Sequence, residues 1–281
     1  MKNNEDWYDL EVAKDPNASP DILTKILRRG NNDPVSQLAA SNSNCSSEIL
    51  TEVLRRRHND LVSQFAARNK NCPPEVLAEV LRRGNADGVS RFAARNSNCP
   101  PEALAEVLRR GIDDWVSRDA ASNRNCPPEI LAEVLRRGKE DGVSQYSAEN
   151  PNCPSDILIE VIRRGNDLVS QFAVQNVNCS SEILTEVLRR EKDDLVSQCA
   201  VRNPNCPPES LAEVLRRGKD DWVSRYAAFN PNCPPRVMIK WMMDTGKIQK
   251  EDSNKHIIEY DDAEEINNSD FEEFKKLAEQ I

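Results

Sequence analysis

Eight cysteines recur along the sequence at nearly constant intervals, and thiols in such a pattern could bind a metal, form disulfides or act as nucleophiles. The interval is 27 residues, with one exception of 26. The members of this cysteine column are Cys45, Cys72, Cys99, Cys126, Cys153, Cys179, Cys206 and Cys233. A ninth cysteine, Cys199, lies outside it. The flanking residues repeat with the same period, so the chemistry open to each thiol depends on how the repeats pack.

One thiol per repeat supplies neither the ligands of a metal site nor the geometry of a disulfide. Helices of neighbouring repeats are expected to lie about 8–10 Å apart, whereas bonded cysteines need Cα atoms within about 7 Å and structural zinc needs four ligands. No C-x-x-C pair occurs, and His58 and His256 belong to no repeated column. We therefore predict no metal and no cofactor, and interpret each thiol as a small buried side chain. Redox sensing and metal binding are the alternatives.

The residues after each cysteine predict a first short helix in every repeat. In one copy Glu75 follows Cys72 by three residues, the N3 position of a capping box. Two prolines at the start suit the first helical turn, and Gly84 is a typical stop signal. The apolar stripe of an amphipathic helix comes from Val76, Leu77, Val80 and Leu81.

A second short helix is predicted between an Asp and an Asn that recur in every repeat. Asp is a strong N-cap, and the column contains Asp33, Asp60, Asp87, Asp114, Asp141, Asp167, Asp194 and Asp221. The Asn that ends this helix, such as Asn96, is expected to adopt the left-handed conformation. A second Asn, such as Asn98, precedes every column cysteine and is expected to bond backbone groups, stacked from repeat to repeat.

Helices this short must bury their apolar faces on neighbouring repeats to be stable. The sequence therefore predicts an all-α fold, an α-solenoid of about eight 27-residue two-helix repeats with capping half-repeats. The predicted organisation is an N-terminal capping half-repeat at 1–17, the solenoid at 18–246, and an acidic linker with a C-terminal amphipathic helix at 247–281. That last helix is expected to dock on the solenoid or on a second chain.

The repeated pattern N-x-N-C-P-x-E-V-L followed by D-x-V-S and A-x-x-N resembles the leucine-rich repeat variant family over about residues 5–246. The resemblance implies a superhelix built from one α-helix and one shorter 3₁₀-type helix per repeat. The present repeats are a few residues longer, so we expect the second helix to be α. Some members carry an iron–sulfur cluster on a separate cysteine-rich N-terminal segment. This sequence has no such segment, so the resemblance implies no cluster here.

The charge of the chain is concentrated at its C-terminal end. The net charge is −9; residues 244–281 contain 12 acidic and 5 basic side chains, a net −7, which leaves −2 for the rest. No stretch approaches the ~18 apolar residues of a membrane span, so we predict a cytoplasmic protein with no membrane partner. No P-loop or nucleophile elbow occurs, and the Asp and Ser columns are explained by helix capping. We predict that the chain is not an enzyme.

Columns that vary between repeats on one face of the second helix indicate where a partner binds. Positions i, i+4 and i+7 of that helix share a face and carry aromatic, aliphatic and arginine side chains, which are common anchors of protein interfaces. The middle of these three columns, at position i+4, is equally explained by packing in the interior of the solenoid. The candidate residues for a protein or peptide partner are Trp115, Trp222, Leu61, Leu195, Arg68, Arg95, Arg202, Phe229 and Tyr226.

The alternative partner is a nucleic acid, because pairs of arginines recur at the end of each first helix and a Gln/Arg column runs along the second. Glu79 lies three and four residues before Arg82 and Arg83, so ion pairing within the stack is expected to consume much of this positive charge. The candidate residues are Arg82, Arg83, Arg91, Arg109, Arg110, Arg118, Arg136 and Arg137.

Overall fold

A computed structural model describes residues 4–247, with side chains from Tyr8 onward. The predicted C-terminal helix and nearly all of the predicted acidic linker lie outside this range. The described residues form 18 α-helices and no strand. The chain divides into two compact units, Met1–Ile157 and Leu158–Ile281.

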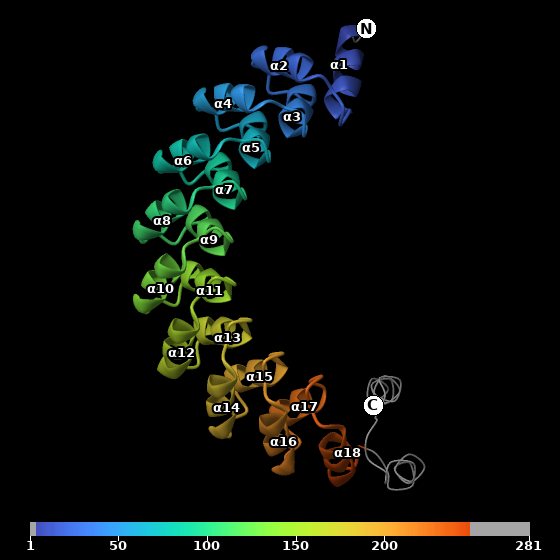
Figure 1. Ribbon diagram of the computed structural model, residues 1–281, viewed down its shortest axis with the longest axis vertical. Helices are drawn as coiled ribbons and strands as arrows, with labels where there is room; N and C mark the ends of the chain where they lie inside the picture. The colour runs from blue at the N-terminus through green and yellow to red at the C-terminus, as the bar shows by residue number, and fades with distance from the viewer. Residues whose placement is uncertain (1–3, 248–281) are drawn as a thin grey trace. The chain divides into compact units, whose positions relative to one another are not determined.

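The first unit contains eleven complete helices, whose order follows the repeats along the chain (Figure 1). They are α1 (Asn4–Lys14), α2 (Pro20–Arg28), α3 (Pro34–Ser41), α4 (Ser47–Arg55), α5 (Leu61–Arg68), α6 (Pro74–Arg82), α7 (Gly88–Arg95), α8 (Pro101–Arg109), α9 (Trp115–Ser122), α10 (Pro128–Arg136) and α11 (Gly142–Glu149). The helix α12 (Ser155–Arg164) contains the boundary between the units. The second unit continues with α13 (Leu168–Gln175), α14 (Ser181–Arg189), α15 (Leu195–Arg202), α16 (Pro208–Arg216), α17 (Trp222–Ala228) and α18 (Pro235–Asp244).

Within each unit the helices form two parallel rows. In the first unit α3, α5, α7, α9 and α11 pack on one another in sequence, and α4, α6, α8 and α10 form the second row (Figure 1). In the first unit, the helices α2, α4, α6, α8 and α10 each pack also on the odd-numbered helix that follows. The chain is thus an α-solenoid of two-helix repeats. The second helix of each repeat is an α-helix, as its length predicts.

The core is a series of small layers that are shared between neighbouring repeats. Leu77, Leu104 and Leu131 occupy the same position on α6, α8 and α10, and each is completely buried. On the odd-numbered helices, pairs of buried alanines such as Ala93 and Ala94 take the equivalent place. Small side chains allow successive odd-numbered helices to approach closely, so each repeat completes the core of its neighbour.

The first helix of a repeat begins one residue later than the sequence predicts. Pro73, and not Cys72, is the N-cap of α6, with φ −67° and ψ 143°. A residue before proline is driven into the extended region, so Pro74 holds Pro73 outside the helix. Glu75 is therefore the second helical residue. Where serine replaces the first proline, the Ser46 hydroxyl accepts a hydrogen bond from the N–H of Ile49 at 3.5 Å.

The recurring asparagines cross-link successive repeats. Asn96 donates from Nδ2 to the carbonyls of Ala67 at 2.7 Å and Asn69 at 3.0 Å, both in the preceding repeat. Its Oδ1 accepts the N–H of Asn98 at 2.8 Å. The predicted left-handed conformation of this column is wrong: Asn96 has φ −65° and ψ 133°. The extended backbone is the conformation in which this side chain makes its bonds to the preceding turn.

The second asparagine of each repeat makes a parallel set of bonds, which confirms its predicted role. Asn98 Nδ2 donates to the carbonyl of Lys70 at 2.6 Å and to that of Cys72 at 3.3 Å. Both acceptors belong to the preceding repeat. The polar turn is therefore bonded from repeat to repeat, beside the buried apolar layers.

Glycine at the end of the first helix supplies a left-handed residue, and two repeats lack it. Gly84 has φ +73°, whereas the equivalent Arg57 and Glu191 have φ +61° and +54°. A side chain costs roughly 1–2 kcal/mol in this conformation.

We expect Arg57→Gly to raise the free energy of unfolding by about 1 kcal/mol in urea titration, because glycine's larger unfolded-state entropy offsets part of the backbone strain that the substitution removes. Gly84→Ala is the matched control and should lower it by about 1 kcal/mol. A loss of stability in Arg57→Gly would contradict the prediction.

Candidate partner-binding site

The cysteine column is buried, and all nine cysteines are free thiols. Burial raises the pKa of the eight column thiols to about 12, as for Cys72, Cys99 and Cys126. Cys199 is buried too, and its Sγ lies 2.9 Å from Nε2 of Gln175. Within residues 4–247, no group of three or more His, Cys, Asp or Glu side chains is placed to hold a metal ion.

Thiol reagents are expected to leave the native protein unmodified. The thiolate is the reactive species, and a pKa of about 12 keeps these column thiols protonated at neutral and mildly alkaline pH. Incubation with iodoacetamide at pH 8, followed by intact-mass measurement, should show no adduct. The same treatment in concentrated guanidinium chloride should modify all nine cysteines. Modification of any column cysteine in folded protein would show that it is accessible.

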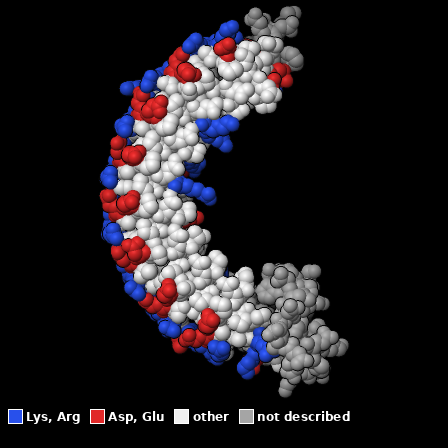
Figure 2. All heavy atoms as spheres, in the orientation of Figure 1, with Lys and Arg blue, Asp and Glu red and all other residues white. Residues whose placement is uncertain are grey.

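The arginine pairs on the even-numbered helices are engaged by acidic side chains and backbone carbonyls. Arg82 Nε lies 3.2 Å from a carboxylate oxygen of Glu106 in the next repeat, and Arg109 lies 3.6 Å from Glu133. Arg83 pairs with Glu79 at 3.4 Å. In the first unit, acidic and basic side chains alternate along this row of helices (Figure 2). The ridge therefore carries little net charge. Arg136 occupies the same column as Arg82 and Arg109.

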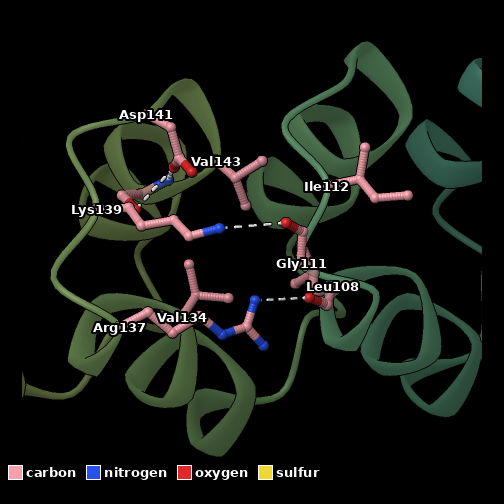
Figure 3. Close-up of a pocket in the computed structure, with 9 residues that line it drawn as sticks. Leu108, Gly111, Ile112, Val134, Arg137, Lys139, Asp141 and Val143 are labelled. Carbon is pink, nitrogen blue, oxygen red and sulfur yellow. Dashed lines mark hydrogen bonds between the residues drawn. The ribbon is translucent and has the colours of Figure 1, made fainter.

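In several repeats the second arginine of the pair caps the preceding even-numbered helix. Arg110 Nη2 donates to the carbonyl of Leu81 at 2.7 Å, and Arg137 Nη1 donates to that of Leu108 at 2.9 Å. Figure 3 shows the second of these bonds beside the one from Lys139 Nζ to the carbonyl of Gly111, at 3.3 Å. The pocket there has a volume of about 10 Å³, room for about one water molecule. This small space is part of the packing interface between two repeats and not a ligand site.

Four of the predicted residues are exposed apolar side chains at the first position of the odd-numbered helices. Leu61, Trp115, Leu195 and Trp222 are 46%, 57%, 56% and 54% exposed. Leu168 occupies the same position on α13 and is 54% exposed, although the sequence comparison did not single it out. On the second unit, Leu168, Leu195 and Trp222 therefore stand on three successive odd-numbered helices. We call the exposed residues at this first helical position the N-terminal column; its members are Leu61, Trp115, Leu168, Leu195 and Trp222.

Trp115 is held between two arginines. The guanidinium carbons of Arg91 and Arg118 lie 5.1 Å and 5.0 Å from the ring centroid. Asp113 fixes Arg118 through two hydrogen bonds of 2.7 Å. These bonds hold the pKa of Asp113 below its usual value. Both arginines were candidates for nucleic-acid contact, and the structure instead places them against a predicted protein-binding tryptophan.

Trp222 is supported in a similar way. Arg225 lies 5.2 Å from the Trp222 ring centroid and bonds Asp220 at 2.9 Å and 3.1 Å. Hydrogen bonds from Arg225 and Lys247 lower the pKa of Asp220 to about 2. Tyr226 stacks on Trp222 with centroids 5.9 Å apart.

The two tryptophan sites share the sequence D-D-W-V-S-R, which occurs only twice in the chain. That motif is the signal by which the aspartates that orient the arginines, Asp113 and Asp220, could have been found from sequence. Cation–π contacts restrict an exposed side chain, so both indole rings are presented in a defined orientation.

The remaining residues of the odd-helix face vary in burial. Tyr226 and Phe92 are half-buried, so the middle column is partly interior, as the packing interpretation predicts. Arg202 lies over the Tyr226 ring at 3.4 Å from its centroid, and Phe229 is 47% exposed at the end of α17. Arg68 is exposed at the end of α5.

Asp119 is the exception in the middle column, because it is a carboxylate that is only 5% exposed. It accepts hydrogen bonds from Arg91 Nε at 3.0 Å and from Arg95 Nε at 2.8 Å, both on the preceding odd-numbered helix. Two cations thus compensate the buried charge, which would be costly alone. No local sequence pattern connects Asp119 with Arg91 and Arg95, which lie 28 and 24 residues before it.

Comparison of the chain with family models, curated proteins and solved structures finds no match. Across residues 4–247, each helix is too short or too polar to cross a bilayer.

Proposed function

We propose that the chain is a non-catalytic, cytoplasmic repeat scaffold that binds a protein or peptide partner along the face of its odd-numbered helices. The observation that carries this proposal is the N-terminal column, where Leu61, Trp115, Leu168, Leu195 and Trp222 are each about half exposed. Within each unit, exposed tryptophans and leucines that recur on the odd-numbered helices are typical of a protein-binding surface. The resemblance to the leucine-rich repeat variant family supports a stacked scaffold, and we propose that the chain is a form of it with an α second helix.

A protein partner fits the charge distribution better than a nucleic acid does. Binding a phosphate backbone requires a row of available cations. The arginine ridge instead pairs with Glu79, Glu106 and Glu133. Of the Gln/Arg column, Arg91 and Arg118 are bonded to Asp119 and Asp113. A salt titration against random RNA and DNA tests the alternative: tight binding that falls steeply as salt increases would favour it.

The double variant Trp115→Ala/Trp222→Ala is expected to lose partner capture while remaining folded. Interface tryptophans commonly contribute about 2 kcal/mol or more each, so the amount captured by full-length bait should fall at least about tenfold. Both side chains are more than half exposed, so helical circular dichroism and the melting temperature should change little. Arg82→Ala/Arg109→Ala on the even-numbered helices is the matched control and should capture normally. Unchanged capture by the folded tryptophan variant would exclude this surface.

A further inference from the structure

A basic cavity lies on the odd-helix face of the first unit, where α5 and α7 end. Arg68, Lys70 and Arg95 line it together with Phe92, Asn96 and Ser97. Its volume is about 520 Å³, which is the size of a ligand pocket and not of a packing defect. Figure 2 shows basic side chains projecting from this face of the first unit, in a region where the surface is otherwise mostly uncharged.

The positive charge of this cavity is not neutralised by its surroundings. Arg68 and Lys70 form no ion pair with any residue in the described range 8–247. The carboxylate near the cavity, Asp119, is shared between Arg91 and Arg95. Of the three cations that line the cavity, Arg95 is therefore paired with Asp119, and Arg68 and Lys70 are not.

Buried Asp119 connects the cavity to the exposed Trp115 ring. Its Oδ1 accepts from Arg95, which lines the cavity, and its Oδ2 accepts from Arg91, which lies over Trp115. One carboxylate thus orients both a cation of the cavity and a cation of the aromatic site. Because these side chains are already fixed, less rotamer entropy is lost on binding.

In the first unit, only α5 and α7 end in an arginine among the odd-numbered helices from α3 to α11. The position of Arg68 and Arg95 is occupied by Ser41 on α3 and Ser122 on α9, and by Glu149 on α11. A nucleic-acid strand would need cations along its whole path, whereas a short run of carboxylates needs only this cluster.

We propose that this cavity and Trp115 together bind an acidic peptide segment of a partner protein. Carboxylates of the peptide lie between Arg68, Lys70 and Arg95, and an apolar side chain of the peptide packs on the Trp115 ring. The inference rests on the proposed scaffold function and names the chemistry of the partner on this part of its face.

The test uses full-length protein and fluorescein-labelled peptides in fluorescence anisotropy at about 50 mM salt, where charge contacts are strong. The probe has the repeated sequence Glu-Glu-Leu, and its control has Gln in place of every Glu. We expect the acidic peptide to bind at least about tenfold more tightly than the neutral one. Arg68→Glu/Lys70→Glu should weaken it at least about tenfold, and so should Trp115→Ala. The matched control Arg55→Glu/Arg82→Glu makes the same charge change on the even-numbered helices and should leave the affinity within about twofold.

Equal binding of the two peptides, or no effect of Arg68→Glu/Lys70→Glu in folded protein, would overturn the proposal. Tighter binding of a random RNA 12-mer that is lost in the same variant would reassign the cavity to phosphate. Acidic-peptide binding that appears only after the acidic residues from Glu251 to Glu279 are changed to their amides would reassign it to the chain's own acidic segment. Partner capture that still depends on Trp115 and Trp222 would then leave the broader scaffold function intact.

Discussion

Replacement of Asn96 by Ala is expected to lower the free energy of unfolding by about 4 kcal/mol, measured by urea titration. The substitution removes the bonds to the carbonyls of Ala67 and Asn69 and the one from the N–H of Asn98. Asn96 is 6% exposed, so water does not readily replace these partners. A buried polar group left without a partner costs about 1–3 kcal/mol. The Ala67 carbonyl and the Asn98 N–H lose their partner, whereas the Asn69 carbonyl keeps the bond from the N–H of Cys72.

Ser97→Ala is the control for the asparagine variant, because the neighbouring Ser97 is exposed and should change stability by no more than about 0.5 kcal/mol. Asn96→Asp provides a second comparison. It keeps an oxygen to accept the Asn98 N–H but loses both donors, so it should be nearly as destabilising as alanine. A decrease of less than about 1 kcal/mol in the free energy of unfolding of Asn96→Ala would mean that the asparagine bonds between repeats contribute little to stacking.

Replacement of Leu104 by Ala should lower the free energy of unfolding by about 3 kcal/mol. Leu104 is completely buried on α8, and a cavity at such a site adds to the lost transfer free energy, for a total of about 2–5 kcal/mol. The effect should be at the higher end, because α8 packs on α6, α9 and α10 and the layer belongs to more than one repeat.

Leu195→Ala is the matched control for Leu104→Ala. Leu195 is 56% exposed, so its truncation should cost less than about 1 kcal/mol. Urea midpoints measured by circular dichroism at 222 nm compare the two variants. Equal losses in both would contradict the assignment of Leu104 to the core and of Leu195 to the surface.

Several local features could be read from the sequence because they depend on neighbours a few residues away. Asp87 accepts the N–H of Ser90 at 2.8 Å, as the spacing of the Asp and Ser columns predicts. Gly84 ends α6 with a positive φ. Leu77, Val80 and Leu81 form the buried stripe that the helical period indicates. The period itself was sufficient to predict the solenoid, since helices of eight or nine residues must share their cores.

Other features were decided only by tertiary packing, because their partners lie one repeat away. Asn96 is extended and not left-handed, since its side chain bonds carbonyls 27 and 29 residues earlier. The sequence places Arg110 in a row of charged side chains, but in the structure it caps α6 through the carbonyl of Leu81, 29 residues before it.

The candidate site likewise combines features that the sequence predicts with features that only the packing of repeats decides. Trp115 and Arg95 are recognisable from sequence as variable surface residues, but their connection through Asp119 depends on contacts that span 24 and 28 residues. The period of the sequence determines which residues recur and how each helix begins and ends. Stacking alone determines which side chains of adjacent repeats meet, because a contact across the interface depends on the relative placement of two helices that no local pattern specifies.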